Sequence, residues 1–190
     1  METWLSSSLV RHFPTTRPRR RKTLGLDAAR GEQVSFQCAF RTEDAVQEVT
    51  AEVESDGLDV RLRRVGYVPL PHLNVETPVE EQDGVGHLPG HVPDPLFPEP
   101  TIQAGPRETN AFWITVRVPK EARPGVHRVR VTLAAEGDEP EALTARVRVH
   151  RGTIEPRRDF PVTHWFYADA LCDWYKVEPF EADFWPLAER

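Results

Sequence analysis

Residues 126–134 read VHRVRVTLA and residues 143–150 read LTARVRVH, and these two stretches decide the fold. In both, small or branched apolar residues alternate with arginine or threonine. A period of two residues is typical of a β-strand with one buried face and one solvated face. The intervening EGDEP at residues 136–140 has the composition of a turn. The two stretches therefore predict an antiparallel pair of strands lying on a hydrophobic core.

Four further segments have the same strand-like composition, rich in β-branched residues: residues 34–40, 46–54, 58–68 and 112–118. Turn sequences SDG at residues 55–57 and RPG at residues 123–125 lie between apolar runs, so we expect hairpin-like, antiparallel connections. No convincing amphipathic helix interrupts this region. The pattern favours a two-sheet β-sandwich over an α/β arrangement.

Residues 69–110 differ from the rest because proline is frequent among them. Proline has no N–H for a strand ladder, so we predict that this stretch is mostly an ordered loop. Several apolar side chains, including Leu88, Phe97 and Ile102, would give the loop something to pack against. The prolines are Pro69, Pro71, Pro78, Pro89, Pro93, Pro95, Pro98, Pro100 and Pro106.

The charge of the chain is mixed, with 24 basic and 30 acidic residues and a net charge of −6. This balance argues against nucleic acid as the main partner. The basic cluster at residues 17–22 is predicted to be a solvated N-terminal loop rather than a contact with RNA or a membrane. Residues 1–14 lack the apolar stretch and cleavage site of a secretory signal, and no segment approaches transmembrane length. We therefore expect no membrane partner and a cytoplasmic location.

The two cysteines, Cys38 and Cys172, fall in different predicted units, so no disulfide framework is expected. Cys38 lies in an alternating strand and is predicted to be a buried apolar residue. Cys172 has no neighbour in the sequence that would activate a thiolate, although a histidine distant in the sequence can supply one in a fold. The nucleophile hypothesis for Cys172 is therefore not favoured.

Five segments, in this order, resemble the N-terminal domain that precedes the catalytic barrel in family 123 glycoside hydrolases. They are ARGEQVSFQ at residues 29–37, PDPLFP at 93–98, WITVRVP at 113–119, RPGVH at 123–127 and FPVTHWFY at 160–167. The resemblance implies a β-sandwich followed by a (β/α)-barrel that hydrolyses β-linked N-acetylgalactosaminides. In that family the substrate's own acetamido oxygen is the nucleophile, assisted by an adjacent Asp–Glu pair on the barrel, beyond the residues of this chain.

The resemblance implies three regions: an N-terminal segment with the basic cluster at residues 1–22, an accessory sandwich at 23–155, and an incomplete barrel start at 156–190. A whole barrel needs about 250 residues. The expected fold class is thus mainly β, an antiparallel β-sandwich followed by the first β/α segment of a truncated barrel. We expect no catalytic residue, metal or cofactor in this chain. The expected partners are the carbohydrate substrate, through the downstream barrel, and the barrel itself.

The candidate substrate-binding residues are His164, Trp165 and Asp169. If residues 162–167 form the first barrel strand, Asp169 follows its C-terminal end, where barrel active sites are built. The tryptophan would stack on a sugar face, and His164 or Asp169 would bind a hydroxyl. The alternative is that the aromatic residues fill the barrel core or its interface with the sandwich. The spacing of Phe180, Phe184 and Leu187 predicts a helix that starts near Pro179.

Two other polar groups have a structural explanation. Asp138 and Glu139 are adjacent carboxylates, but they lie in the predicted turn, where nothing would raise either pKa for acid catalysis. His87, His91 and Asp94 have a spacing that would suit zinc on a helix. The glycines and prolines around them exclude a helix, so a structural loop is favoured.

The sequence supports three functional hypotheses. The first is the non-catalytic N-terminal sandwich of a glycoside hydrolase. The second is a freestanding carbohydrate-binding or adhesion-type sandwich, and the third is a structural interaction domain.

Overall fold

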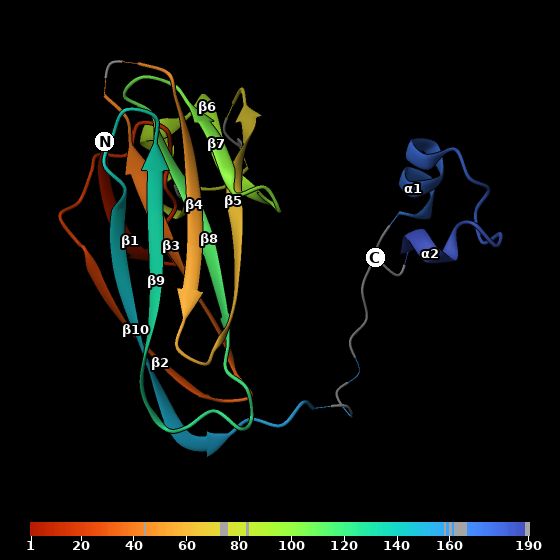
Figure 1. Cartoon of the computed structure of the whole chain (residues 1–190). Helices are drawn as coiled ribbons and strands as arrows, with labels where there is room; N and C mark the ends of the chain where they lie inside the picture. Colours follow the sequence, from red (N-terminus) through yellow and green to blue (C-terminus); the bar gives the residue numbers. More distant parts are fainter. Residues whose placement is uncertain are drawn as a thin grey trace. The chain divides into compact units, whose positions relative to one another are not determined.

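The computed structural model describes residues 1–43, 45–72, 76–82, 84–157, 159, 161 and 167–188. The chain divides into two compact units, Met1–Glu155 and Pro156–Arg190. The first unit is a sandwich of two five-stranded sheets (Figure 1). The second contains only short helices among its described residues.

The strand order of the first sheet is β1-β3-β8-β5-β6, and that of the second sheet is β2-β10-β9-β4-β7. The strands of the first sheet are β1 (Glu2–Ser7), β3 (Gln33–Arg41), β8 (Thr109–Arg117), β5 (Asp59–Leu70) and β6 (Gly90–Phe97). Those of the second sheet are β2 (Thr23–Arg30), β10 (Glu141–Thr153), β9 (Gly125–Ala135), β4 (Gln47–Ser55) and β7 (Thr101–Ala104).

The main core lies between the sheets and is built from alternate residues of each strand. Phe40 of β3 and Phe112 of β8 are fully buried there, with ring centroids 5.8 Å apart. Val129 and Val131 of β9 are buried in the same cluster, whereas Arg128 and Arg130, which alternate with them, are exposed. Cys38 is also fully buried in this core, as its place in an alternating strand predicts.

The six predicted strands are all present, and the predicted antiparallel pair of residues 126–134 and 143–150 is the β9–β10 hairpin. Two expectations about connections are wrong. The turns at residues 55–57 and 123–125 lead from one sheet to the other rather than closing hairpins. The sandwich is also not wholly antiparallel, because β2 pairs with β10 in parallel. Alternation shows which face of a strand is buried, but it does not show which strand lies beside it.

The prediction of a loop over residues 69–110 is wrong in part, because β6, β7 and the start of β8 lie within it. Pro93 and Pro95 belong to β6, which pairs only with β5 among the described strands. Proline is tolerated in such an edge strand because one side of the strand has no ladder to complete. The rest of the stretch holds two short 3-10 helices, η1 (Val79–Glu81) and η2 (Val85–His87).

The N-terminal segment is part of the sandwich. Strand β1 pairs with β3, and residues 8–16 then cross the outer face of the first sheet. The side chains of the basic cluster are exposed, as predicted for a solvated segment. Beneath the crossing segment is a second small hydrophobic cluster, formed by Trp4, Ala39, Val65 and Ala111.

The second unit contains α1 (Ala168–Tyr175) and α2 (Trp185–Ala188). The predicted barrel strand falls almost entirely on residues 162–166, which lie outside the described residues. No barrel segment is shown by the described ones. The helix predicted from Pro179 is wrong in position: Lys176 closes α1 in a left-handed conformation, and Phe180 has a φ of +66°. No helix in the described ranges is long and apolar enough to cross a membrane.

Candidate functional site

Of the three predicted substrate-binding residues, His164 and Trp165 lie outside the described residues. Asp169 lies in the first turn of α1 and is exposed. A carboxylate at this position stabilises the helix through the positive end of its dipole. The structure therefore gives Asp169 a helix-stabilising position and does not test its predicted part in binding substrate.

Cys172, one turn further along α1, has the properties of an unactivated thiol. Partial burial and the nearby carboxylates of Asp169, Glu178 and Asp173 raise its pKa above the ordinary value. The thiol is therefore protonated at neutral pH, and only a thiolate is a strong nucleophile. Burial likewise raises the pKa of Cys38, and no path leads a substrate to it because the side chain is fully enclosed.

The histidines near residue 90 have packing roles. The ring of His87 stacks on Phe13 with a centroid distance of 4.1 Å, and its Nδ1 lies 2.6 Å from the hydroxyl of Thr15. His91 is exposed in the edge strand β6. In the described ranges no three histidine, cysteine or acidic side chains gather in a way that would hold a metal ion. Asp138, in the β9–β10 turn, lies 3.4 Å from the N-terminal amine.

A buried serine–histidine pair joins β1 to the crossing segment. The Oγ of Ser6 and the Nε2 of His12 are 2.5 Å apart, and both side chains are buried. Burial, with a smaller contribution from the charge of Arg19, lowers the pKa of His12 to about 4, so the ring is neutral near pH 7. The Nδ1 of His12 has no partner in the described structure. Among the described residues no carboxylate orients the ring, and both side chains are enclosed, so the pair has the geometry of a structural contact.

The crossing segment is held against the first sheet by hydrogen bonds from side chains of β3 and β5. The hydroxyl of Tyr67 donates to the carbonyl oxygen of His12 or of Thr109, which lie 3.0 and 2.8 Å away. Arg41 donates to the carbonyl oxygens of Pro14 and Thr16 at 3.2 and 3.3 Å. These contacts fix the crossing segment as part of the fold.

Beside the crossing segment, the outer face of the first sheet carries a small pocket of about 210 Å³, here called the Trp113 pocket. Trp113 of β8 is half-buried and contributes to its wall. Each side of the pocket comes from a different part of the fold. The lining residues are Ser8, Val10 and Arg11 of the crossing segment, Gln37 of β3, Val65 of β5, Pro93, Asp94 and Leu96 of β6, and Trp113.

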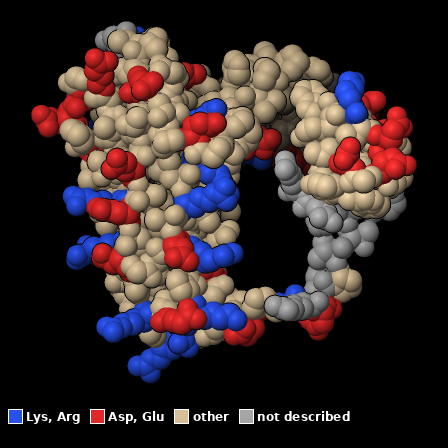
Figure 2. All heavy atoms as spheres, turned by 45° about the vertical axis from the view of Figure 1, so that its right-hand side comes forward, with Lys and Arg blue, Asp and Glu red and all other residues tan. Residues whose placement is uncertain are grey.

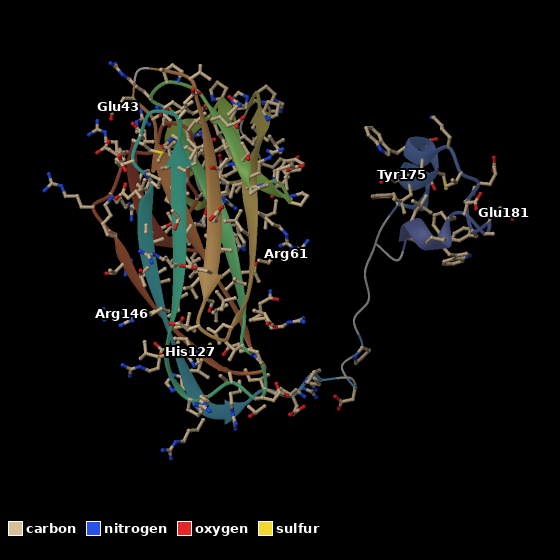
Figure 3. The ribbon with its side chains drawn as sticks, viewed as in Figure 1. Glu43, Arg61, His127, Arg146, Tyr175 and Glu181 are labelled. Carbon is tan, nitrogen blue, oxygen red and sulfur yellow. The ribbon has the colours of Figure 1, made fainter. Side chains whose placement is uncertain are left out.

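The outer face of the second sheet carries a wider, open groove of about 560 Å³. Arg128 of β9 and Arg146 of β10 lie directly opposite each other there, and Arg146 extends outward from the sandwich (Figure 3). Arg130 is 3.9 Å from Glu54 of β4. Acidic side chains thus interrupt the basic ones, and the space-filling view shows both signs of charge interspersed along the sandwich (Figure 2).

Sequence reasoning did not select the Trp113 pocket, although a signal for it was present. Strand β8 alternates Phe112, Ile114 and Val116 on the core side with Trp113 and Thr115 on the other side. A tryptophan at an outward position of an alternating strand indicates that something covers it or binds it.

The described geometry defines a class: a ten-stranded β-sandwich with a crossing N-terminal segment, followed by a small helical unit. No protein-family profile matches the chain, and no curated protein matches it significantly. Among solved structures, the sandwich is similar to the N-terminal part of a family 123 glycoside hydrolase from Clostridium perfringens, studied for glycolipid glycan hydrolysis. The TM-score is 0.59 at 12% identity, over 80% of this chain and 27% of that chain.

Weaker likenesses include a sporulation control protein of Bacillus subtilis and the collagen-binding subdomain of an Enterococcus faecalis surface protein. The first has a TM-score of 0.38 at 12% identity, over 78% of this chain and 49% of that one. The second has a TM-score of 0.37 at 10% identity, over 65% and 93%. Scores this low do not establish a common fold.

Proposed function

We propose that this chain is the non-catalytic N-terminal β-sandwich region of a glycoside hydrolase. Its downstream barrel would act on β-linked N-acetylhexosaminides, of the N-acetylgalactosaminide type, by substrate-assisted hydrolysis. The observation that supports the proposal is the match of most of the chain to the N-terminal part of the Clostridium hydrolase. On this proposal the sandwich supports the barrel and contributes no catalytic residue, metal or cofactor of its own.

The exposed aromatic residues of the second unit support the proposal that the chain packs against another part of the same protein. Among its described residues only Phe184 is fully buried, packed edge-on against Phe180 and Trp185. Trp174 is 79% exposed and Phe180 is 62% exposed. Aromatic surface of this kind tends to be covered by a partner. In the proposed protein that partner is the barrel in the same chain, with neither nucleic acid nor a membrane involved and with a cytoplasmic location.

The test is to express the complete reading frame and assay it on a chromogenic N-acetyl-β-galactosaminide. We expect turnover by the complete product, none by the 190-residue chain, and none by the complete product after replacement of the Asp–Glu pair on its barrel. Turnover by the 190-residue chain alone would overturn the proposal. So would a complete product that folds but hydrolyses no N-acetylhexosaminide.

A second candidate function is a freestanding carbohydrate-binding or adhesion-type sandwich. The Trp113 pocket favours it, because an indole beside a few polar groups is a common arrangement at small-molecule sites. A reading frame that ends without a barrel, together with sugar binding by the 190-residue chain, would favour this candidate over the first.

A further inference from the structure

The Trp113 pocket contains a buried polar side chain with one atom left unused. Gln37 is only 3% exposed. Its Nε2 donates both hydrogens, to the carbonyl oxygens of Ser7 at 3.1 Å and Val10 at 2.6 Å. Its Oε1 accepts no hydrogen bond from the described residues, yet Gln37 lines the pocket. This oxygen is not among the fully enclosed side-chain atoms, so it is accessible from the pocket, and a ligand that donates a hydrogen bond to it would replace water there.

The orientation of this amide follows from its two contacts. Both neighbours of Nε2 are carbonyl oxygens, which only accept, so the nitrogen must face them and the oxygen must face the other way. The crossing segment therefore fixes the acceptor in place before any ligand arrives. A preorganised acceptor of this kind adds selectivity for a donor.

The other residues that line the pocket restrict the kinds of ligand that can bind there. Val10, Val65, Pro93 and Leu96 make the wall largely apolar, and Trp113 adds an aromatic surface. At the rim, the exposed carboxylate of Asp94 has no ion-pair or hydrogen-bond partner among the described residues. The pocket thus combines a largely apolar wall with two acceptors, the amide oxygen of Gln37 and the carboxylate of Asp94. The polar side chains of Ser8 and Arg11 also line it.

We propose that the Trp113 pocket binds a single hexopyranose residue of a glycan. The C–H face of such a ring packs on Trp113, and hydroxyl or acetamido N–H groups at its edge donate to Gln37 and Asp94. The volume of about 210 Å³ is below the range of pockets for drug-sized ligands, which suits one sugar ring rather than an oligosaccharide. This inference names the site and the ligand of the second candidate function and does not rest on the first, because the site lies wholly in the sandwich.

The test uses the 190-residue chain and a panel of methyl β-pyranosides of glucose, galactose, N-acetylglucosamine and N-acetylgalactosamine. Saturation-transfer NMR and titration calorimetry should show saturable binding of at least one member, with a dissociation constant of about 1 mM. Trp113→Ala should weaken binding by about tenfold or more. Asp94→Asn, at an exposed rim position, should weaken it several-fold.

Asp59→Asn is the matched control, because Asp59 is exposed on the same sheet but does not line the pocket. It should bind as the parent chain does. If Trp113→Ala fails to fold, the Asp94→Asn and Asp59→Asn pair decides the question. Absence of binding across the panel, or equal binding by Asp94→Asn and the parent, overturns the proposal. Nuclear Overhauser contacts between Trp113 and residues 167–188 without sugar would also overturn it, since the pocket would then be occupied by the second unit.

Discussion

The outer faces of the two sheets of the sandwich have opposite environments. On the first sheet the outward positions of β1, β3 and β8 include Trp4, Ala39 and Ala111, and the crossing segment buries them. On the second sheet the outward positions of β9 and β10 include four arginines, which remain exposed: Arg128, Arg130, Arg146 and Arg148. Both sheets are built from alternating strands. The difference shows that the outward residues decide whether a sheet face stays in water or acquires a second cluster.

The strongest test of this comparison removes the centre of the covered face. Trp4→Ala deletes a fully buried indole of the second cluster and should lower the free energy of unfolding by about 3–5 kcal/mol. Denaturant unfolding followed by circular dichroism measures the loss. Trp174→Ala, in an exposed position of the second unit, should change it by less than about 0.5 kcal/mol. Similar losses for both variants would mean that the covered face contributes little.

The covered face should also make the sandwich acid-sensitive. In the unfolded chain His12 takes up a proton near pH 6.5, whereas the folded state resists protonation until about pH 4. The unfolded state therefore binds more protons between these values, and stability falls as the pH falls from 6.5 towards 4, by about 3 kcal/mol. Denaturant midpoints of the parent and of His12→Gln across this range measure the effect. The variant should lose the part of the pH slope due to His12; an unchanged slope would contradict the prediction.

A smaller effect is expected where the loop after η1 meets the crossing segment. Gly84 has a φ of +81°, and a Cβ there would lie 2.4 Å from the tip of the Phe13 ring, on whose face His87 stacks. Gly84→Ala should therefore cost about 1–2 kcal/mol. Gly86→Ala, two residues on, meets nothing within 4 Å and should be nearly neutral. Thermal unfolding of the two variants makes the comparison, and equal melting temperatures would show that the contact with Phe13 is not restrictive.

The smallest effect is expected on the open face. Like charges directly opposite each other in a sheet are destabilising, so Arg128→Thr should raise the free energy of unfolding by about 0.5 kcal/mol at low salt. The gain should shrink in high salt because the repulsion is screened. Arg130→Thr removes a partner of Glu54 instead and should give no gain. Urea titrations at two salt concentrations test this, and a gain independent of salt would exclude charge repulsion as its cause.

The sequence was sufficient for the strands whose alternation is regular. Residues 126–134 and 143–150 predicted both the hairpin and its buried face. It was insufficient where the deciding contact is distant in the chain. The covering of Trp4 by His12 depends on hydrogen bonds from Tyr67 and Arg41, and no local pattern reports those. The edge position of β6, which makes its prolines acceptable, is likewise a property of the assembled sheet.

The candidate site also combines a feature that the local sequence shows with one that depends on distant contacts. Trp113 stands out in its strand as an outward aromatic residue, but the unused oxygen of Gln37 is evident only once the carbonyl oxygens of Ser7 and Val10 are seen to occupy its nitrogen. Of the residues predicted to bind substrate, Asp169 is the one that the structure describes, and its predicted role stays a prediction.

The prolines of β6 also bear on how copies of this protein behave at high concentration. An unpaired strand at the margin of a sheet is a template on which another chain can add a strand and begin aggregation. Pro93 and Pro95 lie in such a strand and have no N–H to offer an incoming chain. Replacing them with residues that carry an N–H would let copies of the chain pair edge to edge through β6. No residue of the core would change.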